Sequence, residues 1–133
     1  MRIMLDTNVL ISAVLFPGRR FYRLLEIITT EHTMVLSTFV IEELLAVTDR
    51  KFPQKRTVID RFLSELSYEL IYTPRCIQEE IVQIRDPNDY PILYSAVLGD
   101  VDLLITGDKD FSDLELERPE ILTPSQFLAL YDA

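Results

Sequence analysis

The amino-terminal stretch constrains this chain more than any other, because an apolar run stops at a carboxylate and a helical pattern begins at once. Residues 2–5 read Arg-Ile-Met-Leu, Asp6 follows, and apolar side chains then recur at helical spacing. This order predicts a strand, an acidic residue and a helix. In open α/β sheets, ligands bind beyond the carboxyl ends of the strands. We therefore treat Asp6 as a candidate site residue.

A second predicted strand ends in the same way. Residues 103–105 form an apolar run that is followed by Thr106 and then by Asp108 and Asp110. The carboxyl ends of parallel strands meet at one edge of a sheet. We expect Asp6 and the pair Asp108 and Asp110 to line two walls of one site.

The rest of the sequence alternates helical and extended patterns. Apolar spacing predicts helices at 19–28, 40–47, 58–66, 92–98 and 124–131, and strands at 34–36, 68–72 and 120–122. Residues 73–85 fit either a helix or extended chain, and both interpretations stay open. The alternation favours one α/β domain over residues 1–133, with a mostly parallel sheet of four or five strands and helices on both faces.

Composition restricts the chemistry that such a domain can perform. Cys76 is the only cysteine and His32 the only histidine, so a disulfide, a Cys/His zinc site and a histidine-dependent triad are poorly supported. No apolar run approaches the roughly 18 residues of a membrane span, and no leader pattern is visible, so we expect a cytoplasmic protein without a membrane partner. Any chemistry must come mainly from carboxylates.

The overall charge is acidic, and a formal net charge of −9 argues against broad electrostatic binding to nucleic acid. Divalent cations held by clustered carboxylates would neutralise part of this charge locally. Arg19, Arg20 and Arg23 open the second predicted helix and are candidate contacts for RNA phosphates. The alternative, a solvated basic helix face, stays open at this point.

Two further carboxylates stand at the margins or ends of predicted helices. Projection at about 100° per residue puts Glu43 at the edge of an apolar stripe, whereas Glu42 points further into solvent. Asp89 ends an Asp-Pro-Asn-Asp turn and can cap the next helix. The plainer alternatives are an exposed Glu43, simple helix caps at Asp6 and Asp89, and a polar loop around Asp108.

A cluster of carboxylates would need compensating protons or cations, because like charges repel at short range. Oxygen-only ligands select hard ions such as Mg²⁺ or Mn²⁺. Two such ions roughly 4 Å apart can activate a water and stabilise the leaving oxygen in phosphodiester cleavage. Spacing alone does not choose between this site and the plainer alternatives.

Four segments together resemble the PIN domain family in their order and spacing. They are Met-Leu-Asp-Thr-Asn-Val-Leu at 4–10, Glu-Leu-Leu at 43–45 with Val47, Arg50, Lys51 and Phe52, Arg-Asp-Pro-Asn-Asp-Tyr-Pro-Ile-Leu at 85–93, and Leu-Ile-Thr-Gly-Asp-Lys-Asp-Phe at 104–111. The likeness covers essentially the whole chain. It is closest to the branch that contains the toxins of prokaryotic toxin–antitoxin systems.

This resemblance implies a three-layer α/β/α sandwich and an endoribonuclease that depends on Mg²⁺ or Mn²⁺. It further implies an RNA substrate, an antitoxin protein as partner and a homodimer. The family's acidic positions match Asp6, Glu43, Asp89 and Asp108, with Asp110 as an additional acidic position, and its polar positions near the metal match Asn8 and Thr106. One departure is Asn88, where the family often has aspartate, so the choice of ligand between Asp86 and Asp89 stays open.

Two other functional classes remain as alternatives. A phosphotransfer enzyme or receiver-like domain also places an aspartate after its first strand, and Lys109 could then contact phosphate. Phosphatases of the haloacid dehalogenase type carry a second aspartate where Asn8 stands, and receivers need a phosphoacceptor at a central strand end, where no acidic residue follows Leu36. The other class is a non-catalytic interaction module with the same fold.

Overall fold

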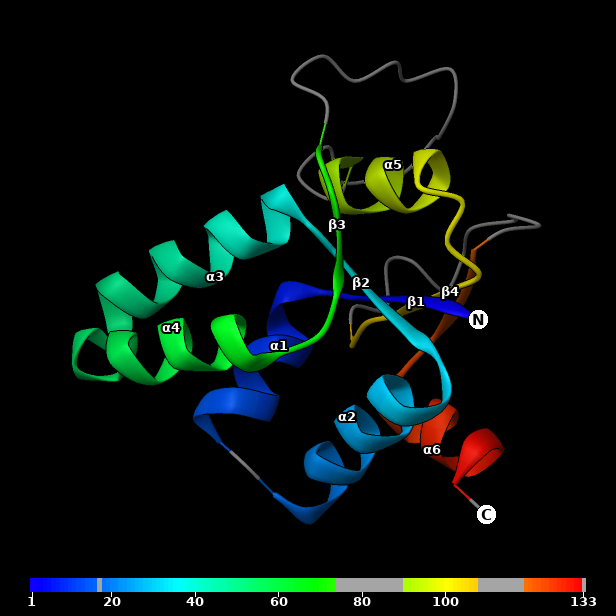
Figure 1. The fold of residues 1–133 in the computed structure, drawn as a ribbon, viewed down its shortest axis with the longest axis horizontal. Helices are drawn as coiled ribbons and strands as arrows, with labels where there is room; N and C mark the ends of the chain where they lie inside the picture. Colours follow the sequence, from blue (N-terminus) through cyan, green and yellow to red (C-terminus); the bar gives the residue numbers. More distant parts are fainter. Residues whose placement is uncertain (17, 74–89, 108–118, 133) are drawn as a thin grey trace.

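The computed structural model describes residues 1–133 except 17, 74–89, 108–118 and 133 (Figure 1). Its elements are β1 (Arg2–Leu5), α1 (Thr7–Leu15), α2 (Arg19–Glu31), β2 (Thr33–Ser37), α3 (Thr38–Lys51), the 3₁₀ turn η1 (Pro53–Lys55), α4 (Arg56–Glu65), β3 (Glu69–Ile71), α5 (Tyr90–Leu98), β4 (Leu103–Ile105), β5 (Glu120–Leu122) and α6 (Pro124–Tyr131). The predicted alternation of strands and helices is confirmed. The open segment at 73–85 lies outside the described residues apart from Thr73.

Five parallel strands form one sheet in the order β3-β2-β1-β4-β5, with β1 at its centre. Leu5 at the end of β1 is in register with Ile105 at the end of β4. In Figure 1, α5 lies on one side of the strands, and α2 and α6 lie on the other. The predicted α/β fold with a parallel sheet of four or five strands is confirmed.

The central strands are short, and β4 throughout and β1 after Arg2 are apolar because helices cover the sheet. Ile3, Met4 and Leu5 of β1 are fully buried, and Leu104 and Ile105 of β4 are equally so. Strands buried on both faces carry continuous apolar runs instead of an alternating pattern. This burial fixes where β1 and β4 stop, and therefore where the polar residues behind them emerge.

Polar side chains begin several helices. Ser37 Oγ accepts a hydrogen bond of 3.1 Å from the Val40 N–H at the start of α3, and Thr123 forms a capping box with Gln126 at the start of α6. Asp6 precedes α1 in the same way. These caps place each helix directly after the carboxyl end of a strand.

The end of α3 differs from the sequence-based expectation, whereas α5 ends before Gly99 as predicted. The helix α3 continues to Lys51, beyond the predicted end at 47, because Arg50 and Lys51 are good helix formers and the pattern stops only ahead of Pro53. Gly99 follows α5, and an added Cβ there would collide with Ile71 Cδ1. No helix in the described ranges is long and apolar enough to cross a membrane.

Candidate metal centre and adjoining grooves

Asp6 is a buried carboxylate, only 6% exposed, at the carboxyl end of the central strand. Its Oδ1 accepts a hydrogen bond of 2.6 Å from the Thr7 N–H, and its Oδ2 accepts one of 2.7 Å from Thr106 Oγ1. Its own N–H donates to the Ile105 carbonyl at 3.0 Å. The backbone and both carboxylate oxygens are therefore fixed in orientation.

Thr106 reaches Asp6 because β1 and β4 are neighbours in register. Thr106 is 1% exposed, and its N–H donates to the Leu122 carbonyl at 3.0 Å, which anchors it to β5. The structure thus brings together two residues that are 100 positions apart in the sequence. The predicted site residues Asp108 and Asp110 follow Thr106 closely in the sequence but lie outside the described residues.

Glu43 and Asn8 line one groove between α1 and α3, with a volume of about 570 Å³. Glu43 is half-buried there, whereas Glu42 is exposed, as the helical projection predicts. Asn8 is exposed, and Thr7 also lines the groove. The groove therefore extends from the residues behind Asp6 along the side of α3.

The side-chain oxygen atoms at this end of the sheet are of the type that hard cations prefer. Asp6 at the strand end and Glu43 in the groove carry carboxylates, and the buried Thr7 Oγ1 has no hydrogen-bond partner among the described residues. Leaving a buried hydroxyl unpaired costs about 1–3 kcal/mol, so a water or an ion beside it would be favourable. An oxygen-only donor set suits Mg²⁺ or Mn²⁺.

Within the described ranges, no group of three or more His, Cys, Asp or Glu side chains is placed to hold a metal ion. The expected ligand Asp89 directly precedes α5 in the sequence, but it lies, like Asp108 and Asp110, outside those ranges. The ligand set that the sequence predicts therefore stays a prediction.

A hydroxyl network that sequence reasoning missed connects three elements behind the site. Thr73 Oγ1 accepts hydrogen bonds from the Phe39 N–H at 3.2 Å and from Ser95 Oγ at 2.9 Å, and the Thr73 N–H donates to Thr38 Oγ1 at 2.9 Å. It joins the chain after β3 to the start of α3 and to the middle of α5. The network fixes the position of the helix that Asp89 precedes. Isolated hydroxyl residues far apart in the sequence carry no periodic signal that could have revealed it.

The three arginines of α2 face a different cavity, of about 630 Å³. Arg23 donates to Glu26 at 2.6 Å and to Asp132 at 2.9 Å, and these carboxylates raise the pKa of its guanidinium. Arg19 and Arg20 are exposed. Their contact with RNA stays a prediction, and for Arg23 it would compete with two existing ion pairs.

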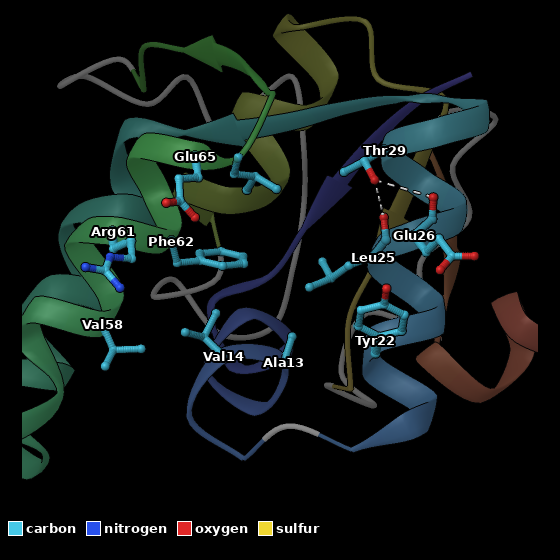
Figure 2. Close-up of a pocket in the computed structure, with 11 residues that line it drawn as sticks. Ala13, Val14, Tyr22, Leu25, Glu26, Thr29, Val58, Arg61, Phe62 and Glu65 are labelled. Atoms are coloured by element: carbon cyan, nitrogen blue, oxygen red, sulfur yellow. Dashed lines mark hydrogen bonds between the residues drawn. The ribbon is translucent and has the colours of Figure 1, made fainter.

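A further groove, of about 540 Å³, lies between α1, α2 and α4 (Figure 2). Its walls are mainly apolar, and Val14, Leu25 and Phe62 point into it. Tyr22 and Val58 on its sides are 69% and 47% exposed. Among the described residues that line it, Glu26 and Glu65 are the acidic ones, and neither is buried as Asp6 is.

The fold and the buried aspartate at the end of β1 agree with the comparison to known families. A model of the PIN domain family matches residues 2–110. The chain therefore belongs to the PIN domain family, as the sequence resemblance predicts.

Two solved structures share this fold. VapBC2 from Rickettsia felis, bound to a DNA fragment from its promoter, is 24% identical over 92% of this chain and 98% of that chain, with a TM-score of 0.73. A toxin–antitoxin complex from Klebsiella pneumoniae is 24% identical over 92% of this chain and 97% of that chain, with a TM-score of 0.64. No curated protein matches the chain.

Proposed function

We propose that this chain is a metal-dependent endoribonuclease and the toxin of a toxin–antitoxin pair. The observation that carries the proposal is Asp6, a buried and doubly oriented carboxylate at the end of the central strand of a PIN domain. Strand ends of parallel α/β sheets are where such folds bind ligands. The acidic residues around it in the sequence fit the ligand chemistry of Mg²⁺ or Mn²⁺.

Each site residue then has a role in phosphodiester hydrolysis. Asp6, Asp89 and Asp108 would hold the metal, with Asp110 as an additional acidic group, and Glu43 would hold it or position the attacking water. When bound, the ions would supply an activated water and stabilise the leaving oxygen. Thr106 keeps Asp6 in one orientation through its hydroxyl. No covalent enzyme intermediate is expected.

The decisive experiment compares wild type with Asp6→Asn on a panel of RNAs, with Mn²⁺ and with EDTA. We expect cleavage that needs the metal and Asp6. At roughly a 100-fold excess over its Kd, the metal should also stabilise wild type by about 2.7 kcal/mol and the variant by less. Wild-type activity in a clean preparation of Asp6→Asn would reject the metal mechanism. A folded wild type that cleaves no RNA would favour the non-catalytic module.

The same preparations test the phosphotransfer alternative. A hydrolase that uses a metal-bound water forms no phosphoaspartate, so acetyl phosphate should leave Asp6 unmodified. Mass spectrometry after incubation measures this directly. Stoichiometric modification at Asp6 would support the phosphotransfer class.

The antitoxin partner and the homodimer are also part of this proposal. The two similar structures are described as VapBC2 and as a toxin–antitoxin complex. In this chain, the apolar groove between α1, α2 and α4 is consistent with a protein partner. Its residues Tyr22 and Val58 expose apolar surface beside the charged Arg61 and Glu65. Coexpression with the protein encoded beside it should give an inactive complex, and Val58→Asp should release active nuclease. Light scattering on the free chain should report a dimer.

A further inference from the structure

The groove between α1 and α3 has two ends of opposite chemistry. Asn8 and Glu43 lie at the end near Asp6, and Arg50 and Lys51 lie at the other. Glu43 and Arg50 are seven residues apart on α3, which corresponds to about 10 Å along the helix axis. The groove therefore leads from the acidic centre to a pair of basic side chains.

These two cations differ in their pairing from Arg56, which follows them in the sequence. Arg56 donates to Asp49 at 2.6 Å and to Asp60 at 3.0 Å, whereas the described part of the chain contains no ion pair of Arg50 or Lys51. Their place in the last turn of α3 complements the helix dipole. The helix dipole explains their position at the end of α3 but not their place in the same groove as Glu43. Because neither side chain forms an ion pair with a described residue, both are available to bind an anion, although the chain as a whole has a formal charge of −9.

An aromatic pair lies beside these cations. Phe16 and Phe52 pack edge to face, with ring centroids 5.6 Å apart and an interplanar angle of 79°. Phe52 is half-buried and holds the pair in place, whereas Phe16 is 59% exposed. An exposed ring next to basic side chains is the combination that binds single-stranded nucleic acid, through base stacking and phosphate contacts.

We infer that this α1–α3 groove binds a single strand of RNA and delivers it to the carboxylate site. Arg50 and Lys51 hold backbone phosphates, and Phe16 stacks on a base. The inference rests on the proposed ribonuclease function and adds the path of its substrate. The apolar α2–α4 groove carries no comparable pair of cations beside an exposed phenylalanine.

The phosphate contacts are tested by the salt dependence of binding. A fluorescein-labelled, single-stranded RNA of mixed sequence is titrated with protein carrying Asp6→Asn, in EDTA, at several KCl concentrations. Adding Arg50→Gln and Lys51→Gln should reduce the slope of log Kd against log salt by about 0.7 per lost contact. The matched control is Lys55→Gln with Arg61→Gln, which removes the same two charges outside the groove and should leave the slope unchanged. Equal slopes in both double variants would overturn the inference.

The stacking contact is tested at Phe16. Phe16→Leu keeps an apolar side chain but removes the ring, and should weaken RNA binding about fivefold or more, whereas Phe16→Tyr should bind like Phe. If Phe16→Leu leaves the RNA Kd unchanged and dissociates a dimer, this face is a protein interface and the inference is wrong.

Cleavage by wild type in Mn²⁺ separates this result from the proposed function. If wild type cleaves RNA but the groove variants bind RNA as wild type does, the proposed path of the substrate is wrong and the proposed ribonuclease function still holds. Neither cleavage nor RNA binding by wild type would reject both.

Discussion

At the carboxyl end of β1, Asp6 is nearly buried and adjoins a groove, with its oxygens oriented by Thr7 and Thr106. At the amino end of the neighbouring β4, Asp102 is partly buried, and its Oδ2 accepts a hydrogen bond of 2.8 Å from the Arg2 N–H. The Asp102 N–H also donates to the Arg2 carbonyl at 2.9 Å. Two aspartates beside the same pair of strands therefore lie at opposite edges of the sheet. Asp6 lies at the edge formed by the carboxyl ends of the strands, and Asp102 lies at the edge formed by their amino ends.

The amino edge consists of polar groups that satisfy one another. Arg2 donates to Glu69 at 2.6 Å and to the Gly99 carbonyl at 3.0 Å, which connects β1 to β3 and to the end of α5. At the carboxyl edge, the buried Thr7 Oγ1 has no hydrogen-bond partner in the part of the chain that the structure describes, and Glu43 faces a groove. At the amino edge the polar groups pair with one another across strands, whereas at the carboxyl edge Asp6 is held by Thr106 and polar groups also lie beside an open groove.

The largest expected effect on activity comes from a substitution at the carboxyl edge. Glu43→Gln should reduce metal-dependent RNA cleavage about 100-fold or more, because the amide can neither position a water as a base nor balance a metal's charge. Glu42→Gln, one residue away and exposed, is the matched control and should be fully active. Single-turnover cleavage rates measure both, and equal rates would remove Glu43 from the site.

A smaller effect is expected from the residue that orients Asp6. Thr106→Val preserves shape but removes the hydroxyl that donates to Asp6 Oδ2, so cleavage should fall on the order of tenfold, as it does when a ligand's supporting hydrogen bond is lost. Thr106→Ser should restore most of the rate. Weaker metal binding by Thr106→Val would show that the hydroxyl acts through Asp6 as a metal ligand. An unchanged cleavage rate and metal affinity would show that Asp6 does not need the hydrogen bond from Thr106.

The amino edge should show the reverse pattern. Asp102→Ala leaves the Arg2 N–H without its side-chain partner and should lower the free energy of unfolding by about 1–3 kcal/mol. The cleavage rate of the folded protein should stay within about twofold of wild type. Urea denaturation and single-turnover assays measure the two quantities, with Asp102→Asn as a milder variant that keeps an acceptor. A large loss of activity in the stable Asn variant would contradict the division between the two edges.

The strand ends at the carboxyl edge were predictable because local patterns specify them. Apolar runs that stop at a polar residue locate the ends of β1 and β4, and a projection of α3 separates Glu43 from Glu42. The roles of Asp89 and Asp108 as ligands came from the family resemblance and stay predictions.

Contacts between distant residues could not be predicted in this way. Arg2 and Asp102 are 100 positions apart, and Arg23 pairs with Asp132 across 109 positions. Such pairs depend on strand order and helix docking, which periodicity does not specify. The same limit hid the groove that Phe16 and Arg50 share, because their elements meet only in the folded chain.

The smallest expected effect concerns His32, at the amino edge. Burial, and then the positive charge of the nearby amino terminus, lower the pKa of His32, although Glu31 opposes them. The amino group lies 3.3 Å from His32 Nδ1, and the ring packs edge to face on Tyr131. The folded state therefore holds the neutral imidazole more strongly than the unfolded chain does.

Because its folded pKa lies below the unfolded value, His32 contributes stability above about pH 6.5 that is lost as pH falls through the folded pKa. The contribution should stay below about 1 kcal/mol, since the ring is partly exposed and screened. His32→Gln has no side chain that titrates in this range. The free energy of unfolding of both proteins is measured with denaturant at several pH values between about 5 and 8. The difference between the two proteins isolates the contribution of His32, because the contributions of other groups cancel. Wild type should lose more stability than the variant on acidification. A constant difference over this range would show that folding does not lower the pKa of His32.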